Sequence, residues 1–577
     1  MEHRAKARPD SVCLERKSRF GSQWKPITIS EFGKSILRVS RGLLGMGIEP
    51  GETIAVFAAT SYEWSLLDMA ALSVGIVVVP IYESDSAEQI QWILEDSAIR
   101  VVFTDTAPNL ELVESVRTDS LLPTVLLDDD GFAALYESSN TISEEAASAR
   151  RAALTADSLA TIIYTSGTTG RPKGVELTHG NLVFSVLTIL KLEREIINLE
   201  SSRVLLFLPL AHIMARIVFL YGLAGKGRIG HVPNTNNLIA DLQSFKPTAL
   251  LVVPRVLEKV YNAAEAKSGG GRKLKIFRWA AQTAVENSQR SHHGPFFRVK
   301  RAIARKLVWS KMTAILGEDC HYAVSAGAPL GKRLGHVFRG IGLTVIEAFG
   351  LTETTGPATV NRPAAFVMGS VGQTIPGTSL RLTGEGEVLV KGPHIMRGYH
   401  RNPTATAEVI DDDGWFRTGD VGTIDNKGFL SITGRKKELI VTAGGKNVAP
   451  AVLEDKLRGH PLISQVVVVG DQRPFISALI ILDPEMLPGW LASHGLEAMD
   501  VNEASRHPEV LAALQRAIER TNRQVSRAES IRKFTIISGD FTQENGLLTP
   551  SLKVKRNRVL ERYSAAIDDI YSGQPAT

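Results

Sequence analysis

Residues 164–174 read Tyr-Thr-Ser-Gly-Thr-Thr-Gly-Arg-Pro-Lys-Gly, and this stretch decides how the rest of the chain is interpreted. The apolar residues 159–163 before it are typical of a buried strand, and a helix signal begins near Thr178. Glycines let backbone N–H groups approach an anion closely, and Lys173 adds a positive charge. The hydroxyls that can donate to phosphate oxygens, or help to hold a metal, are those of Thr165, Ser166, Thr168 and Thr169. The stretch therefore predicts a loop that binds a polyanion.

The stretch differs from the Walker phosphate loop, which requires a Gly-Lys-Ser/Thr ending. Pro172 separates Gly170 from Lys173, and Gly174 stands where that pattern needs a hydroxyl. A simple surface turn rich in glycine and threonine is the structural alternative. The order of the residues, rather than their composition, favours phosphate binding.

This ordered string resembles the phosphate loop of the adenylate-forming superfamily. That family includes acyl- and aryl-CoA synthetases, the adenylation domains of peptide synthetases and firefly luciferase. The resemblance implies that seven residues bind a nucleotide. They are Thr165, Ser166, Gly167, Thr168, Thr169, Gly170 and Lys173.

Length and composition set limits that agree with this resemblance. The 577 residues suggest roughly three to four domain-sized units, and the net charge of +5 is too small to indicate a nucleic-acid-binding protein. The only cysteines, Cys13 and Cys320, are far apart, which argues against a disulfide framework or a zinc site and favours a reducing compartment. There is no secretory signal and no run of about 18 apolar residues. A cytoplasmic protein is expected, with contact at the inner face of a membrane as one option.

Strand and helix signals alternate through most of the chain, which predicts an α/β fold with parallel sheets. The expected helices include 64–74 and 87–96, and residues 128–157 are expected to form a surface connection. The expected buried strands are 53–59, 75–80, 100–105, 203–212, 248–254 and 321–330. Two similar α/β subdomains are the simplest arrangement.

The pattern of the sequence changes near residue 371, where short strand signals separated by turns predict a small β-rich subdomain. A compact α+β unit follows, with a helix at 450–457 and strands at 465–470 and 475–482. We therefore expect a large N-terminal domain at 1–434 that binds AMP. A smaller, mobile C-terminal domain is expected at 435–577.

Residues 347–353, Glu-Ala-Phe-Gly-Leu-Thr-Glu, resemble a second motif of the superfamily. The resemblance implies that Phe349 stacks near the adenine, Thr352 contacts phosphate and Glu353 holds Mg²⁺, with Ala348 and Gly350 also at the nucleotide. A carboxylate suits Mg²⁺, which prefers oxygen ligands. The family more often has tyrosine at the position of Phe349, so a role that needs a phenol hydroxyl is in question. Without the phosphate loop, Glu353 would be interpreted as an exposed turn carboxylate.

Three further positions match family residues. Asp420, in Arg-Thr-Gly-Asp, resembles the aspartate that accepts hydrogen bonds from both ribose hydroxyls, which suits a carboxylate. Arg435 resembles the second ribose and phosphate contact, and Lys437 falls at the hinge of the small domain. Taken alone, the run 434–438 would be a solvated turn.

The sequence Leu-Thr-Pro-Ser-Leu-Lys-Val-Lys-Arg at 548–556 resembles the loop that carries the family's catalytic lysine. Lys553 is the preferred candidate, with Leu552 in place of the usual glycine, and Lys555 is the alternative. A basic tail before a terminal helix is the structural alternative. Gly327 lies at the carboxyl end of a predicted strand, where a flat base or an acyl chain can pack on the backbone, so it is a candidate for both the nucleotide site and the acyl pocket. His212 resembles a family histidine at the acyl pocket, although a structural role is equally plausible.

The resemblance covers residues 30–565 and looks most like the long-chain fatty acyl-CoA synthetase branch. It implies that ATP and Mg²⁺ activate a fatty acid to acyl-AMP and that coenzyme A then accepts the acyl group. The alternatives are a ligase that loads a carrier protein and a scaffold that binds nucleotide without turnover. Acyl chain length and oligomeric state stay open.

Residues 267–311 hold twelve lysines and arginines, one glutamate (Glu286) and several large apolar residues. A pair of surface helices with solvated faces is the simpler interpretation. An anionic lipid surface or the phosphates of coenzyme A are the alternatives, and the apolar residues favour the membrane surface slightly.

Overall fold

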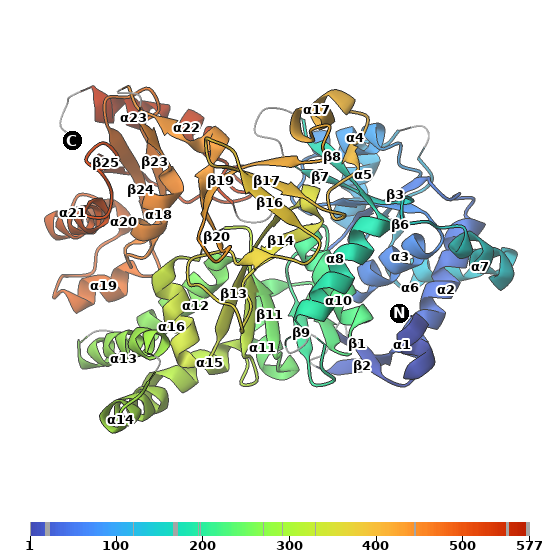
Figure 1. Cartoon of the computed structure of the whole chain (residues 1–577), viewed down its shortest axis with the longest axis horizontal. Coiled ribbons are helices and arrows are strands. Elements are labelled where there is room, and N and C mark those ends of the chain that lie inside the picture. The colour runs from blue at the N-terminus through green and yellow to red at the C-terminus, as the bar shows by residue number, and fades with distance from the viewer. Residues whose placement is uncertain are drawn as a thin grey trace.

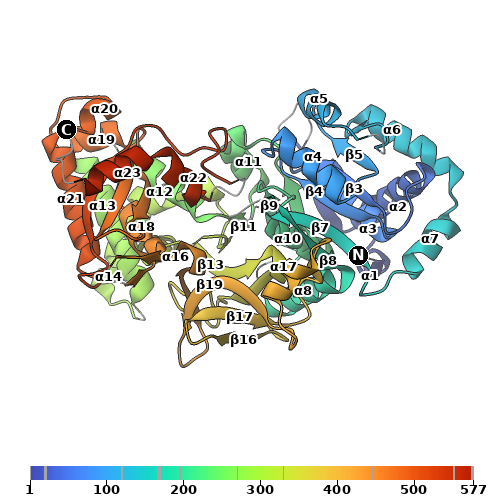
Figure 2. The same ribbon diagram turned by 90° about the horizontal axis from the view of Figure 1, so that it is seen from above.

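The computed structural model describes residues 2–17, 23–118, 121–165, 171–193, 196, 198–268, 271–290, 292–328, 330–443, 446–549 and 553–572. Two mixed sheets, each parallel at its centre, form the body of the large N-terminal part (Figures 1 and 2). A β-rich unit lies against them, and a smaller α+β domain follows at the C-terminal end. The α/β prediction is confirmed.

The first sheet has the order β18-β8-β7-β4-β3-β5-β6. Strands β4, β3, β5 and β6 run parallel, and β4 also pairs in parallel with β7, whereas β8 and β18 are antiparallel to their neighbours. The bounds are β3 (Thr53–Phe57), β4 (Val77–Ile81), β5 (Val101–Thr104), β6 (Val125–Leu126), β7 (Leu159–Thr165), β8 (Lys173–Thr178) and β18 (Gly398–Tyr399).

The second sheet has the order β15-β14-β13-β12-β11-β9-β10-β1-β2. Its five central pairings, from β13 to β1, are parallel, and both edges are antiparallel. The bounds are β1 (Val12–Lys17), β2 (Trp24–Thr28), β9 (Arg203–Leu206), β10 (Arg228–His231), β11 (Ala249–Val252), β12 (Tyr322–Ser325), β13 (Thr344–Leu351), β14 (Gly356–Val360) and β15 (Gln373–Thr374).

Helices cover both faces of each sheet and produce a layered body. Helices α3 (Tyr62–Ser73), α8 (His179–Leu192) and α10 (Ile213–Ala224) share one buried apolar cluster with residues of both sheets. On the outer face of the first sheet lie α4 (Ala87–Asp96) and α5 (Ala107–Ser115). The outer cluster of the second sheet includes residues of α11 (Leu238–Phe245), α12 (Pro254–Lys267), α13 (Gly271–Gln289), α14 (Pro295–Ala304), η3 (Arg305–Trp309), α15 (Ser310–Leu316) and α16 (Lys332–Ile341).

The segment 128–157, expected to be a surface connection, contains helices that were not predicted. It contains α6 (Asp129–Ser138), η1 (Ser139–Thr141) and α7 (Glu144–Ala152), of which α6 and α7 begin at side-chain caps. Asp128 accepts from the Gly131 N–H, and Ser143 accepts from the Ala146 N–H. These caps, rather than a strong apolar stripe, define the two helices. Helices α6 and α7 pack against α2 (Ile29–Gly45).

The β-rich unit is a four-stranded antiparallel sheet, and the C-terminal domain has a three-stranded sheet between two groups of helices. The bounds in the β-rich unit are β16 (Ser379–Leu382), β17 (Glu387–Lys391), β19 (Phe416–Ile424) and β20 (Leu430–Arg435), with α17 (Pro403–Val409) nearby. Those in the C-terminal domain are β21 (Ile440–Val441), β22 (Asn447–Val448), β23 (Ile463–Val469), β24 (Ile476–Leu482), β25 (Ile531–Ile536), α18 (Pro450–Arg458), α19 (Leu487–Ser493), α20 (Val501–Ala504), α21 (Pro508–Asn522), α22 (Arg556–Arg562) and α23 (Ser564–Tyr571).

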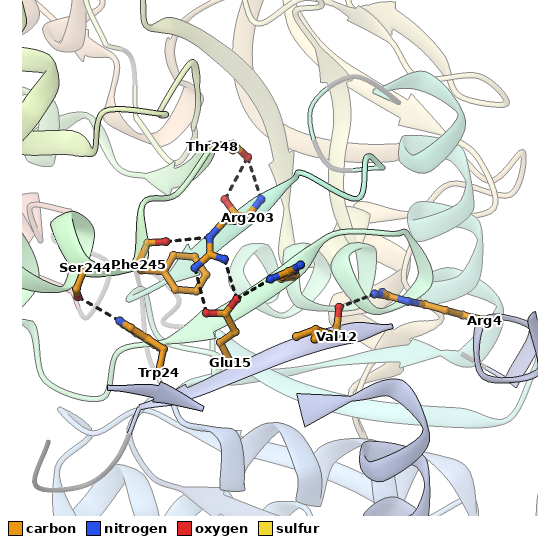
Figure 3. Close-up of polar contacts among 9 residues, drawn as sticks. Arg4, Val12, Glu15, Trp24, Arg203, Ser244, Phe245 and Thr248 are labelled. Atoms are coloured by element: carbon orange, nitrogen blue, oxygen red, sulfur yellow. Dashed lines mark hydrogen bonds and ion pairs between the residues drawn. The ribbon is translucent and has the colours of Figure 1, made fainter. Parts of the chain in front are cut away.

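The N-terminal hairpin β1–β2 belongs to the second sheet, although the strands that follow it in the chain, β3 to β8, belong to the first. Glu15 on β1 accepts from both terminal nitrogens of Arg203 at 2.8 and 3.0 Å (Figure 3). Arg203 also donates to the Phe245 carbonyl at 2.9 Å, and Trp24 donates to the Ser244 hydroxyl at 3.1 Å. Helix α1 (Glu2–Ala7) contributes Arg4, which donates to backbone carbonyls of β1 and of the turn after α10. The hairpin is therefore held by a network of charged side chains and backbone groups.

A fully buried ion pair joins the two subdomains. Arg216 on α10 donates to Asp68 on α3 at 2.9 Å and to the Thr161 hydroxyl on β7 at 2.6 Å, and neither charged side chain is exposed. The Trp64 ring lies 5.7 Å from the Arg216 guanidinium. Among the described residues, no helix is both long enough and apolar enough to cross a membrane.

We predict that Asp68→Asn destabilises the N-terminal part strongly, because the Arg216 charge then stays buried without its counterion, a loss of about 3–5 kcal/mol. Glu200→Gln is the control, since it breaks an exposed pair with Arg8 that contributes about 0–1 kcal/mol. Thermal unfolding followed by circular dichroism measures both variants. Similar transition temperatures for the two variants would contradict the prediction.

Candidate active site

The phosphate-loop candidate is the connection of a β-hairpin. Strand β7 ends at Thr165, β8 begins at Lys173, and these two residues are paired across the hairpin. Ser166, Gly167, Thr168, Thr169 and Gly170 lie outside the described residues. The helix expected to begin near Thr178 is confirmed, because α8 starts after the Thr178 cap, and strand β8 lies between the loop and this helix.

Strand β18 brings a tyrosine to Lys173. Tyr399 donates a hydrogen bond to Glu353 Oε1 at 3.0 Å, and Lys173 Nζ lies 5.0 Å from the centre of the Tyr399 ring. Burial and the nearby Glu353 carboxylate raise the pKa of the Tyr399 phenol, so it remains a donor. Tyr399 carries no signal in the sequence, because only the antiparallel pairing of β18 with β8 places it here.

The next pair of site residues comes from β19 and β20. Asp420 and Arg435 are paired in register, and Arg435 Nε lies 3.1 Å from Asp420 Oδ1. Burial raises the pKa of the Asp420 carboxyl, while Arg435 and then Lys553 counteract that rise. Lys437 follows in the exposed turn η5 (Lys436–Glu438).

Lys553 extends from the C-terminal domain to the N-terminal part. A Cβ atom placed on Gly327 would lie 3.4 Å from Lys553 Cε and 3.9 Å from Nζ. The Lys553 side chain keeps solvent contact, yet surrounding protein atoms and then Arg435 lower the pKa of its ammonium; Asp420, Glu438 and Glu353 counteract this. Within the described residues Lys553 forms no ion pair, since Arg435 already occupies Asp420.

The two candidate lysines have different neighbours. Lys553 approaches Gly327 and Asp420, whereas Lys555 lies near Asp85, whose carboxyl pKa rises to about 6 through burial despite the Lys555 charge. His212, the cap of α10, lies on the Lys553 side, and burial followed by the Lys553 charge lowers the pKa of His212 to about 4. His212 is therefore neutral near pH 7.

The loop that carries Lys553 is fixed to its own domain. Leu548 pairs with Val554, and the Lys555 N–H donates to the Leu547 carbonyl at 2.8 Å. Arg556 donates to the Val468 carbonyl at 2.7 Å and forms an ion pair with Glu454. The position of Lys553 therefore depends on the position of the whole C-terminal domain.

The motif at 347–353 divides its residues between two environments. Phe349 is 8% exposed and packs with Ala358 and residues of the β-rich sheet, so its ring is part of a core in this arrangement. Ala348 lines an apolar cavity rather than the polar site. A Cβ on Gly350 would lie 1.9 Å from the Gly356 carbonyl oxygen, which explains the glycine. Thr352 and Glu353 form the turn η4 (Thr352–Thr354).

The apolar cavity lies between helices α8 and α10 and the strands of the second sheet. Its lining comes from α8, α10 and strands β9, β11, β12, β13 and β14, and almost all of it is apolar. It includes Ile189, Met214, Val218, Leu251, Val324 and Ala348. Since Ala348 precedes the turn with Glu353, the cavity and the polar site share β13.

No group of three or more His, Cys, Asp or Glu residues among the described positions could hold a metal ion. The arrangement still fits Mg²⁺, which commonly binds one or two carboxylates together with substrate phosphates. Glu353 supplies a carboxylate beside Lys173 and Tyr399. Thr165 pairs with Lys173 at the end of the same hairpin.

Comparison with known families assigns both parts of the chain. Residues 1–400 match the family of AMP-binding enzymes, and residues 437–575 match the AMP-binding enzyme C-terminal domain. The chain belongs to the AMP-binding enzyme family. The recognition of the adenylate-forming superfamily from its motifs is thereby confirmed.

Relatives of this AMP-binding enzyme are similar over nearly the whole chain. It is 45% identical to the long-chain-fatty-acid–CoA ligase FadD15 of Mycobacterium bovis, over 98% of this chain and 95% of the relative. It is 31% identical to the long-chain-fatty-acid–CoA ligase ACSBG2 of Rattus norvegicus, over 96% and 90% of the two chains. The crystal structure of the adenylation domain of a carboxylate reductase from Mycobacterium chelonae has the same fold, with a TM-score of 0.76 at 22% identity, over 99% and 90% of the two chains.

Proposed function

We propose that this protein is an AMP-forming long-chain fatty acid–CoA ligase. ATP activates the fatty acid to acyl-AMP with release of pyrophosphate, and coenzyme A then takes the acyl group and releases AMP. One observation carries the proposal: Lys553, from the C-terminal domain, lies against Gly327 and beside Asp420 and Arg435. The 45% identity to a long-chain-fatty-acid–CoA ligase over 98% of the chain supports the substrate class.

The residues around this point can hold ATP in a defined orientation. Asp420 and Arg435 suit the ribose hydroxyls, since a carboxylate accepts two hydrogen bonds. Residues 165–170, with Lys173, are proposed to bind the phosphates. Phe349, Gly350 and Thr352 are proposed to lie on the adenine and phosphate side, with the Phe349 ring acting through packing.

The first half-reaction requires positive charge, because the attacking carboxylate and the α-phosphate repel each other. Lys173 and Lys553 supply fixed cations, and neither forms an ion pair among the described residues, so both are available to an anionic substrate. Bound Mg²⁺, held by Glu353 and Thr165, would add positive charge at the phosphates. Tyr399 orients the Glu353 carboxylate through its hydrogen bond.

The acyl chain is proposed to enter the apolar cavity, with its carboxylate near Gly327. His212 caps α10, and its Nδ1 accepts from the Met214 N–H at 3.2 Å, so the ring is held in place. Met214 itself lines the cavity. His212, two residues before Met214, is therefore proposed to contact the carboxylate in its neutral form, without adding a charge.

The second half-reaction is proposed to use a different arrangement of the domains 1–434 and 435–577, reached by rotation near Lys437. Arg556 and Glu454 keep the Lys553 loop attached to the moving domain, so rotation withdraws the cation. Closure and opening of this kind commonly separate catalytic steps. The coenzyme A thiol would then attack acyl-AMP. A cytoplasmic location, in contact with fatty acid, ATP and coenzyme A, is part of this proposal.

The interface between the two domains contains a carboxyl group that responds to pH. Asp455 on α18 has a pKa raised to about 7 by burial; Arg458 counteracts this rise, and Glu454, Glu258 and Glu347 reinforce it. Glu258 on α12 and Glu347 on β13 belong to the N-terminal part. Ionisation of Asp455 therefore places like charges across the interface and opposes this arrangement as the pH rises.

We predict that Lys553→Ala lowers the rate of acyl-adenylate formation by about 10²–10³, as expected for loss of one preorganised charge. Thioester formation from supplied acyl-AMP is expected to remain largely intact. Pyrophosphate release and acyl-CoA formation measure the two steps. Lys555→Ala is the matched control, since that side chain lies toward Asp85. Equal loss of both steps in Lys553→Ala would reject the assignment.

We predict that Asp455→Asn makes adenylate formation less sensitive to rising pH. The pKa of Asp455 is raised in this domain arrangement, so the arrangement loses stability as the pH rises above the ordinary pKa of aspartate. This loss levels off above pH 7, where Asp455 is already ionised. The ratio of the rate at pH 8 to that at pH 6 should rise in the variant by up to about 10-fold in total, because only the pH unit between 6 and 7 contributes within this window. The exposed Asp569→Asn serves as the control. An unchanged ratio in Asp455→Asn contradicts the inferred coupling.

We predict that Val218→Phe shifts the preference toward shorter fatty acids, because Val218 lines the cavity. Each methylene excluded from an apolar site loses about 0.8 kcal/mol, or about fourfold in kcat/KM. Ile189→Ala enlarges the same cavity and should shift the preference in the opposite direction. A series of fatty acids of graded length measures both variants. Val183→Phe, at an exposed position of α8, is the control. Profiles that fall in parallel at all lengths would show that the cavity does not hold the chain.

A further inference from the structure

Helices α13 and α14, with the π-helical turn η3, form a helical hairpin at the lower left edge of the molecule in Figure 1. The two arms contact each other directly. Trp309 Nε1 donates to the Ala280 carbonyl at 3.0 Å, and Lys300 forms an ion pair with Glu286 at 2.8 Å. One face of the hairpin packs on the outer core of the second sheet. The remaining surface is free to contact another body.

A stripe of large apolar side chains lies on this free surface. Phe296 is 86% exposed and Val299 is 59% exposed, and both are on α14. Ile303 and Leu307 continue the stripe, which has the three- and four-residue spacing of one helix face. On α13, Ile276 and Trp279 are also exposed. Exposure of several large apolar residues together on two packed helices marks a contact surface, whereas scattered single residues do not.

The same hairpin carries a strong positive charge. Lysine and arginine outnumber acidic residues by twelve to one in 267–311, whereas the whole chain has a net charge of only +5, so the remainder of the chain is negative overall. The single acid, Glu286, is already paired with Lys300. Among the described residues, no ion pair is formed by Lys273, Lys275, Arg301, Arg305 or Lys306, all of which are exposed. These charges are available to an anionic partner.

An open hollow lies at the start of α14, next to the most exposed apolar residue. His292, His293, Gly294, Arg298 and Arg301 line it. Arg298 donates to the His293 carbonyl at 3.1 Å, and this bond fixes the residues just before α14 next to the arginine. The hollow thus places guanidinium groups beside Phe296, as required by a partner with a phosphate group next to an apolar region.

We propose that this helical hairpin docks the protein on the surface of an anionic phospholipid bilayer. Phe296, Val299 and Ile303 would enter the boundary between headgroups and acyl chains, and the arginines and lysines would bind lipid phosphates. Apolar residues with long basic side chains beside them are the pattern of helices that lie in a membrane interface. A second copy of the chain is disfavoured as the occupant, because two such positive surfaces repel. The inference goes beyond the proposed reaction and does not depend on it.

Vesicle binding by the full-length protein tests the proposal without any substrate. The protein is mixed with vesicles of equimolar phosphatidylcholine and phosphatidylglycerol, or of phosphatidylcholine alone, and separated by flotation. We expect binding to the anionic vesicles, and weakening as salt screens the charges. Absence of binding to the anionic vesicles, or equal binding to both kinds, would overturn the proposal.

Two sets of substitutions locate the contact. Phe296→Ser/Val299→Ser/Ile303→Ser removes exposed apolar groups, and Arg298→Gln/Arg301→Gln/Arg305→Gln removes three charges. Each is expected to weaken vesicle binding by at least about 10-fold, since each basic residue near an anionic surface contributes substantially. The matched controls are Val183→Ser/Leu187→Ser on α8 and Arg506→Gln/Arg523→Gln/Arg527→Gln in the C-terminal domain, all at exposed positions. If the controls weaken binding as much as the hairpin variants, the proposed contact is wrong.

A label at the tip of the stripe reports insertion directly. Both native cysteines are buried, so Phe296→Cys can be labelled selectively with an environment-sensitive fluorophore. We expect a blue shift of its emission when anionic vesicles are added, and no shift for the same label at Val183→Cys. A shift that depends only on protein concentration, without lipid, would indicate contact with a second copy and would overturn the proposal. Unchanged emission with bound vesicles would also overturn it.

Discussion

The contact between the two domains places one ammonium group, that of Lys553, next to the Gly327 backbone, without an ion pair among the described residues. Arg435 makes this possible, because it forms the ion pair with Asp420 that Lys553 could otherwise form. The side chain of any residue other than glycine at position 327 would stand in van der Waals contact with Lys553 Cε, and the backbone there has φ +89°. A positive charge that is partly desolvated and unpaired favours an anion strongly. The contact between the two domains therefore places a partly desolvated positive charge where an anion could bind.

The polar and apolar parts of the site meet because of the sheet topology. Strands β12 and β13 run parallel with Ser325 opposite Glu347, so their carboxyl ends lie at the same edge. Gly327 follows one strand, and Glu353 follows the other. Ligands of open α/β sheets bind beyond such ends. The cavity runs beneath the same strands through Val324 and Ala348. A substrate with a charged head and a hydrocarbon tail thus matches the two environments, and the parallel strands alone bring these environments together.

Much of this architecture could be predicted from the residues, and the failures have physical causes. The apolar runs at 53–59 and 248–254 predicted their strands correctly, since buried parallel strands are continuously apolar. Helices α6 and α7 were missed because they are defined by caps in a polar segment. Tyr399 could not have been found, because only pairing with β8, more than two hundred residues away, places it at Lys173. For the same reason, Lys553 and Lys555 could be separated only by the positions of Gly327 and Asp85.

The N-terminal hairpin has a consequence for how the protein is made. Glu15 on β1 cannot form its ion pair until Arg203, 188 residues later in the chain, has been synthesised. At ordinary translation speeds, that delay is about 10 to 40 s. During this time the newborn strand has an open edge and several apolar side chains without a sheet to join. Most of the first subdomain must therefore emerge from the ribosome before the β1–β2 hairpin can join its sheet. Chaperone binding during synthesis is expected to concentrate on this hairpin.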